Sequence, residues 1–308
     1  MTTDRRRLLA WLLAAAGLLV IGWIVSRVGI ARLAEAAARL APWVPFVFLL
    51  EGVRWLADAW TTWLLYGSAR REASWRRMVE ASVAAYTVIL LLPAGRLGGE
   101  VLKAAAMRRD VGLGRAAAAA VAMQALPLLA GALVSLPCVA TAWWAWGPTA
   151  LTGAIALQAV TAIALGAAIL WASRRKALGR LARRVSEELG ATTDEVQREL
   201  GGGVITVPVL AAAVTSRSLL AAQIALLASA VDVPGGVVGG LLTVGLHFVG
   251  QAVGDLVPAQ LGATDGALAL GAEALGAPAA ALVAAALVFH ASQLAWAAVG
   301  AVVGARMR

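Results

Sequence analysis

The sequence predicts an all-α polytopic membrane protein with about 6–8 transmembrane helices, arranged as two inverted repeats that each contain a re-entrant hairpin. Composition is the first observation, because 61% of the 308 residues are hydrophobic and 14% are charged. In a typical soluble domain, roughly a quarter of all residues are charged. The second observation is a series of long apolar runs separated by short basic segments. The third is that proline, glycine and charged residues interrupt two apolar regions, where a lipid-embedded helix would simply continue.

Charge, cysteine and motif content exclude several other classes of protein. The formal net charge is +9, but the basic residues flank apolar segments, so anionic lipid and not nucleic acid is the expected counterpart. The single cysteine, Cys138, excludes an internal disulfide and a cysteine metal cluster. No His/Glu pair has metal-ligand spacing, and the sequence has neither a P-loop nor a nucleophile elbow. We therefore expect no metal and no cofactor, and we assign no catalytic residue.

The first membrane repeat is expected to cover residues 1–172. Three arginines at 5–7 precede an apolar run at 8–25, which we interpret as a retained first helix that begins in the cytoplasm. Residues 27–41 combine charged and apolar residues at helical spacing, which predicts a short amphipathic helix lying at the membrane interface. A second span follows at about 42–66.

This second span carries three charged residues, Glu51, Arg54 and Asp58. Spacings of three and four residues put all three on one helix face, so that Arg54 can pair with either acid. Two interpretations are open: a structural ion pair that joins helices, or the lining of a polar cavity.

The first interrupted region lies between an apolar run and a basic segment. Its residues that do not suit a continuous lipid-embedded helix are Pro93, Gly95, Arg96, Gly98, Gly99, Glu100 and Lys103. The apolar run before it, at 79–92, is short, since a span needs roughly 20 residues. Both ends of the unit at 79–107 lie next to arginines. We therefore expect a re-entrant hairpin that opens to the cytoplasm, with two short full spans as the alternative.

Ordinary spans at about 116–140 and 149–172 complete the first repeat. The uncharged, tryptophan-rich turn at 143–148 suits the outer membrane interface. Residues 173–203 are predicted to form a cytoplasmic amphipathic linker on the anionic inner leaflet. The second repeat then covers residues 204–308.

This second repeat contains a weaker copy of the interruption, in a re-entrant motif near 237–277. Its residues are Pro258, Gly262 and Asp265, with Asp255 shortly before them. In both copies an acid follows a proline by seven positions. Most of the 26 lysines and arginines fall on segments that this layout places in the cytoplasm, together with both termini. The first hairpin then opens to the inside and the second to the outside, as in inverted repeats with a substrate site at the midplane.

The charged residues of the two interruptions suggest an anion-binding cavity, and freed backbone N–H groups at the glycines can also hold an anion. The cations suited to a phosphate are Arg96, Lys103 and Arg217. The acids Glu100, Asp255 and Asp265 can receive an amine or a proton, or each can simply cap the start of its own helix. An unpaired charge at the bilayer centre costs at least roughly 2.5–3.5 kcal/mol. We therefore expect Glu100, Arg96 and Arg217 to face one shared cavity. The predicted substrate-binding residues are Arg96, Gly98, Gly99, Glu100, Lys103, Arg217, Asp255 and Asp265, and those that shape the breaks are Pro93, Gly95, Pro258 and Gly262.

Residues 93–100, PAGRLGGE, together with Lys103, resemble the P-x-x-x-G-G-E signature of the lysylphosphatidylglycerol synthase transmembrane-region family, whose members are also called flippase-like membrane proteins. Residues 258–266 resemble that family's second motif, P-x-x-L-G-x-x-E-G, with Asp265 in place of the glutamate. Two positions depart from the family. Met123-Gln124 stands where the family often has Glu-Arg, and His290 stands near the place of an arginine in the last helix.

The resemblance implies a multi-pass protein of the bacterial inner membrane that moves or handles amphiphilic lipids. We therefore expect it to translocate an amphiphilic lipid or lipid-linked molecule across that membrane, with phospholipid or another amphiphile as its partner. The alternative is a non-catalytic membrane partner of an enzyme that synthesises lipids or polyprenol-linked glycans. An enzyme comes third, because a transferase needs a base and a donor site, and Glu100 is the one candidate for the base.

Overall fold

The computed structural model describes residues 22, 26, 29–92, 95–173, 187–201, 205–254, 257, 260 and 262–307, and its regular secondary structure there is helical throughout. Six helices of this part of the chain are long and apolar enough to cross a membrane. The predicted all-α polytopic fold is confirmed. The expected first helix at 8–25 and the basic half of the linker at 174–186 lie outside the described residues.

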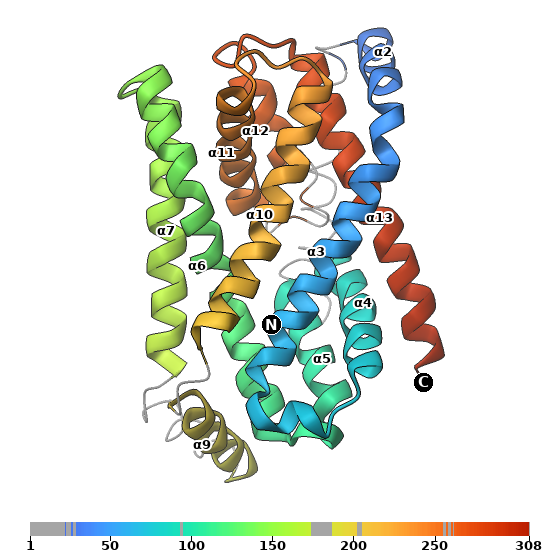
Figure 1. Cartoon of the computed structure of the whole chain (residues 1–308), viewed down its shortest axis with the longest axis vertical. Helices are drawn as coiled ribbons and strands as arrows, with labels where there is room; N and C mark the ends of the chain where they lie inside the picture. The colour runs from blue at the N-terminus through green and yellow to red at the C-terminus, as the bar shows by residue number, and fades with distance from the viewer. Residues whose placement is uncertain are drawn as a thin grey trace.

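The chain begins with one long rod. Helix α2 (Ile30–Leu40), the 3₁₀ turn η1 (Ala41–Trp43) and α3 (Val44–Leu65) follow one another as a single 36-residue helical segment (Figure 1). The expectation of an interfacial helix at 27–41 is therefore wrong. Its apolar face packs against the last helix through Ala36 and Leu40, both buried, while Ile30 stays exposed, and the segment continues directly into α3.

Helices α4 (Trp75–Leu91) and α5 (Gly95–Val111) form the first hairpin. Both lie in the lower half of Figure 1, and neither is among the six candidate spans. The hydroxyl of Ser74 accepts a hydrogen bond from the backbone N–H of Arg77 and so caps the start of α4. Each of these helices has 17 residues, so they are shorter than the six candidate spans, and the re-entrant hairpin stays a prediction beside the two short full spans.

Two further helices, α6 (Leu113–Trp146) and α7 (Ala150–Ser173), run beside each other along the other side of the molecule (Figure 1). Trp143 and Trp144, both exposed, lie in the last turn of α6, so the turn that we expected at 143–148 begins only after Trp146. Helix α9 (Glu187–Gly201) lies at the opposite end of the molecule, where Arg115 and Glu199 tie it to α6 with a 3.0 Å ion pair.

The remaining helices are α10 (Val207–Ala230), α11 (Val237–Gly254), α12 (Ala263–Gly271) and α13 (Ala279–Arg306). Helices α11 and α12 form the second hairpin, which occupies the upper half of Figure 1. Helix α11 is long enough to count as a candidate span. The chain nevertheless turns back and returns through α12 to the same end of the molecule. The two hairpins therefore enter from opposite ends of the molecule, as inverted repeats require.

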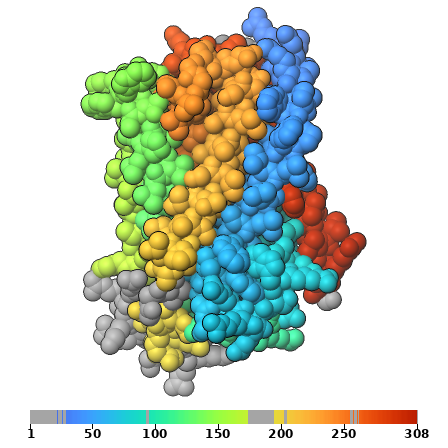
Figure 2. All heavy atoms as spheres, in the orientation of Figure 1, coloured from blue at the N-terminus to red at the C-terminus, as the bar shows by residue number. Residues whose placement is uncertain are grey.

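The long helices enclose these hairpins. In the space-filling view α3 and α10 lie side by side as diagonal bands across the front face (Figure 2). Most of the described exposed lysines and arginines lie at the lower end, on η2 (Gly67–Arg71) and on the adjoining ends of α4, α5, α6, α9 and α13, whereas Arg32 and Arg39 on α2 lie toward the upper end. The exposed basic residues are thus distributed unequally along the long axis of the molecule.

Candidate functional site

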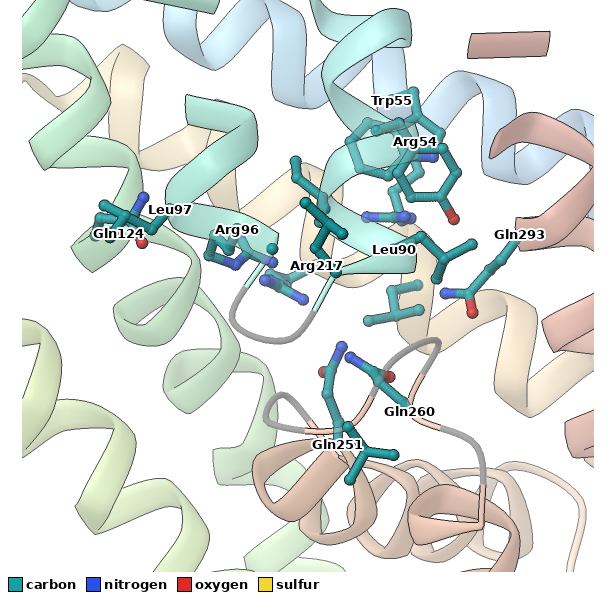
Figure 3. A pocket seen from close by; sticks show the side chains of 16 residues that line it. Arg54, Trp55, Leu90, Arg96, Leu97, Gln124, Arg217, Gln251, Gln260 and Gln293 are labelled. Atoms are coloured by element: carbon teal, nitrogen blue, oxygen red, sulfur yellow. The ribbon is translucent and has the colours of Figure 1, made fainter. Parts of the chain in front are cut away.

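The ends of the two hairpins meet at a cavity of about 260 Å³, which we call the tip cavity (Figure 3). Both hairpins contribute to its wall, together with α3, α6, α10 and α13. Its polar and charged lining side chains are Arg54, Tyr86, Arg96, Gln124, Arg217, Gln251, Gln260 and Gln293. No carboxylate lines this cavity in the part of the chain that the structure describes.

Two guanidinium groups from different elements converge in the tip cavity. Arg96 extends from the first turn of α5, and Arg217 extends from the middle of α10. The two side chains lie next to each other (Figure 3), and Arg217 is 8% exposed. Two of the three residues that we expected to share a cavity therefore do share one.

The third arginine, Arg54, is held in a buried network. Its Nε donates to Oε2 of Glu51 at 2.9 Å, and its Nη1 lies 3.5 Å from Oδ2 of Asp58. The other oxygen of Glu51 accepts hydrogen bonds from Trp55 Nε1 and Tyr86 Oη, both at 3.0 Å. Both interpretations of this cluster apply, because the ion pairs are present and Arg54 also lines the cavity.

These two acids compensate part of the cavity's positive charge. Asp58 lies within electrostatic reach of Arg217 and Arg96 as well as Arg54. Three guanidinium groups face two nearby carboxylates, which leaves a net positive charge among the described residues of this region. The start of α5 adds to it, since the first N–H groups of a helix carry a partial positive charge.

Glu100 does not line the tip cavity, which corrects our expectation. It lies one turn further along α5 than Arg96, and its Oε1 is 2.8 Å from Nζ of Lys103. Lys103 also donates to Oγ1 of Thr62 on α3, at 3.3 Å. Lys103 thus links α5 to α3, Oε2 of Glu100 has no hydrogen-bond partner among the described residues, and neither Glu100 nor Lys103 lines the tip cavity.

The glycines of the first hairpin do not all lie at the expected anion site. Gly95 lines the tip cavity, but Gly98 and Gly99 face α4. A Cβ on Gly99 would lie 2.3 Å from Cγ1 of Ile89, and one on Gly95 would lie 2.2 Å from the carbonyl oxygen of Val88. Small residues here let two helices pack closely, which is their usual role between membrane helices.

Asp265 does not line the tip cavity either. Its Oδ2 accepts a hydrogen bond from the backbone N–H of Gly262 at 2.8 Å and lies 3.4 Å from Nε2 of His290. Gly262 has a φ of 82°, a left-handed conformation that glycine adopts readily. Asp265 therefore caps α12, the simpler of the two roles we considered. Three further predicted positions, Pro93, Asp255 and Pro258, lie outside the described residues.

An apolar groove of about 420 Å³ adjoins the tip cavity between α6, α7 and α11. The two spaces share Arg96, Gln124, Arg217 and Gln251. Leu165, at the edge of this groove, is 51% exposed, so the groove reaches the surface that faces lipid. A charged cavity is thus continuous with an apolar groove, an arrangement that matches an amphiphile.

Comparison with known proteins identifies the family of this chain. The family model described as the lysylphosphatidylglycerol synthase TM region matches residues 8–300. The chain belongs to the lysylphosphatidylglycerol synthase transmembrane-region family. No curated protein and no solved structure matches it significantly. Membership in the family associates the chain with lipid modification or translocation in a membrane.

In this member of the lysylphosphatidylglycerol synthase transmembrane-region family, sequence analysis missed the amides of the tip cavity. Gln260 and Gln293 were assigned no role, and Gln124 was noted as a departure from the family. Each of these glutamines interrupts an apolar or broken segment. A polar side chain within a membrane helix points to a cavity or a binding site, so a signal was present.

Proposed function

We propose that the protein translocates an anionic amphiphilic lipid across the bacterial inner membrane. The observation that carries this proposal is the convergence of Arg96 and Arg217 in a cavity between two opposed hairpins. The apolar groove beside that cavity supplies the second half of an amphiphile site.

Electrostatics favours an anion as the occupant. Two guanidinium groups in one cavity repel each other, and removing each from water at bilayer depth is costly. A phosphate between them would relieve both costs, because guanidinium groups bind phosphate oxygens in a bidentate geometry with strong, charge-assisted hydrogen bonds. The N-terminal N–H groups of α5 would add to the attraction.

The groove explains how a lipid would enter. Apolar residues such as Leu128, Leu165, Ile169 and Phe248 line much of its wall, and it leads from the exposed surface at Leu165 to Arg96 and Arg217. A head group can therefore occupy the tip cavity while its chain stays in an apolar environment. A chain left in water would lose about 0.8 kcal/mol for each exposed methylene group.

The opposed hairpins offer a route to both faces of the membrane. Each hairpin enters from a different end of the molecule, so a small movement of either one would expose the tip cavity to a different side. We assign the basic lower end, with α9 and the C-terminus, to the cytoplasm, because basic residues concentrate on the cytoplasmic side of membrane proteins.

The test is lipid movement by the reconstituted protein. Arg217→Gln keeps a polar, hydrogen-bonding side chain and removes the charge. We expect it to slow translocation of a fluorescent anionic phospholipid by roughly ten-fold or more, because it removes a charge-assisted hydrogen bond. Arg76→Gln is the matched control, since the Arg76 side chain is 89% exposed at the lower end. Wild-type rates in both Arg217→Gln and Arg96→Gln would show that the tip cavity is not the path.

A further inference from the structure

A buried cluster of polar side chains around His290 joins the second hairpin to the last helix. Nε2 of His290, on α13, lies 2.9 Å from Oγ1 of Thr264 and 3.4 Å from Oδ2 of Asp265, and both of these residues are on α12. Nδ1 of His290 lies 3.3 Å from Oε1 of Gln293. Asp265 is 1% exposed and His290 is 2% exposed. The cluster adjoins the tip cavity, because Gln293 also lines that cavity.

The protonation state of the His290 ring decides how this contact is made. The Oε1 atom of Gln293 is an acceptor, so the tautomer that bonds to it carries its proton on Nδ1. In that neutral ring Nε2 is an acceptor, to which Thr264 can donate, but its lone pair also faces the carboxylate of Asp265. A second proton, on Nε2, turns this contact into an ion pair between α12 and α13. The contact is therefore stronger at low pH and weakens as the pH rises.

Asp265 has little compensation for its charge while the ring is neutral. Its Oδ2 accepts a hydrogen bond from the backbone N–H of Gly262, but its buried Oδ1 has no hydrogen-bond partner among the described residues. A buried carboxylate is costly unless it is both paired and hydrogen-bonded. The pair is neutral as a whole with a proton on Nε2 and carries one negative charge without it.

The other ionisable groups around α13 are engaged elsewhere, exposed, or uncharged beside His290. His247 on α11 packs against Phe289 with 5.3 Å between the ring centroids, and its ring nitrogens have no hydrogen-bond partner among the described residues. Groups on α3, α4 and α10 line the tip cavity or belong to the network around Arg54: Glu51, Arg54, Asp58, Tyr86 and Arg217. Groups on α2, at the start of α4, after α12 and at the end of α13 are exposed or partly exposed: Arg32, Glu35, Arg39, Arg76, Arg77, Glu80, Glu273 and Arg306. Asp265 is thus the described carboxylate that pairs with His290.

We propose that His290 and Asp265 form a proton-binding site whose occupancy controls the second hairpin. A proton taken up from water holds α12 on α13, and its return to water frees the hairpin to move. Gln293 contacts the ring and lines the tip cavity, so an anion in the cavity and a proton on the ring favour each other's binding. This inference rests on the proposed function for the lipid, but it concerns the ion that drives the movement.

Nuclear magnetic resonance tests the proton site directly, because the chain contains only two histidines. The full-length protein, labelled with ¹⁵N-histidine, would be placed in nanodiscs of phosphatidylglycerol and phosphatidylethanolamine. We expect the His290 ring, identified by the loss of its signals in His290→Gln, to keep a proton on Nδ1 and to gain one on Nε2 as the pH falls from about 8 to about 5. A ring that keeps one protonation state over this range would overturn the inference.

Two variants separate the pair from its surroundings. Asp265→Asn removes the opposite charge and should move the midpoint of the His290 titration to lower pH by about one unit or more. The control, His247→Phe, removes the other imidazole and keeps an aromatic ring against Phe289, so the His290 titration should remain. An unmoved midpoint in a folded Asp265→Asn protein would count against the pair.

Translocation in vesicles tests the consequence for lipid movement. We expect an imposed pH gradient to accelerate wild-type translocation of the fluorescent anionic phospholipid, and a protonophore to cancel the acceleration. His290→Gln keeps a hydrogen-bonding side chain and should move lipid at one rate with and without the gradient. Wild-type movement that ignores the gradient would overturn the control of the hairpin by the proton and leave the proposed function standing. If no lipid moves under any condition, the proposed function is overturned, while a titrating His290 still supports the proton site.

Discussion

Glu100 and Lys103 form a buried ion pair on α5, with Oε1 of Glu100 2.8 Å from Nζ of Lys103. Both residues are less than 5% exposed, and Lys103 also donates to Thr62 on α3. This pair joins the first hairpin to α3 and leaves Arg96 as the charged residue of α5 that lines the tip cavity.

The variant Glu100→Gln would leave Lys103 buried without its counter-charge. We expect a loss of about 3–5 kcal/mol in the free energy of unfolding, measured by tryptophan fluorescence in mixed micelles. The double variant Glu100→Gln/Lys103→Met removes both charges and should recover most of this loss. The control, Glu80→Gln, breaks the exposed pair with Arg76 and should cost less than about 1 kcal/mol. Equal stability of Glu100→Gln and Glu80→Gln would contradict the structure.

The same double variant also tests the role of Glu100 in transport. Because neither Glu100 nor Lys103 lines the tip cavity, we expect the folded double variant to translocate anionic lipid at nearly the wild-type rate. A stable double variant that moves no lipid would instead place Glu100 on the transport path.

Close packing of α4 and α5 should depend on Gly99. A Cβ at this position meets Cγ1 of Ile89 at 2.3 Å, so we expect Gly99→Ala to cost about 1–3 kcal/mol of unfolding free energy. Gly98→Ala should cost less, because its nearest neighbour is a side-chain atom of Val88 at 3.0 Å. Gly153→Ala on α7 meets nothing within 4 Å and should stabilise by up to about 1 kcal/mol. The same denaturation assay ranks the unfolding free energies of the three variants. An unchanged unfolding free energy in Gly99→Ala would argue against this packing.

Orientation in the membrane can be tested by labelling single cysteines in a Cys138→Ala background. Trp144→Cys lies in the exposed last turn of α6, and Arg198→Cys lies on α9 at the opposite end. We expect a membrane-impermeant maleimide to label Trp144→Cys in intact cells and Arg198→Cys after permeabilisation only. The reverse pattern would invert the proposed orientation.

Hydropathy and charge predicted the fold class because the bilayer imposes strong rules on both. The interruption at 93–100 was found because proline, glycine and charge are rare together in a membrane span. The amphipathic segment at 27–41 was misplaced because its apolar face binds α13, and periodicity cannot distinguish a protein surface from a membrane surface. Tertiary packing decided that question.

The site was predictable in part, for a similar reason. Arg96 and Arg217 attracted attention as charges at membrane depth, and the cavity contains both. Glu100 is likewise a charged residue at membrane depth, but it forms an ion pair with Lys103, three residues later. Sequence spacing shows that such a pair can form, yet it does not show which charged groups remain available to a ligand. The amides gave a weaker signal because glutamine is uncharged.

The central claim is that an anionic head group binds between Arg96 and Arg217. Cryo-electron microscopy of the full-length protein in nanodiscs containing phosphatidylglycerol would locate a bound lipid directly. We expect phosphate density within hydrogen-bond distance of both guanidinium groups, with an acyl chain in the groove between α6, α7 and α11. Lipid density elsewhere, with the tip cavity holding water alone, would contradict the account.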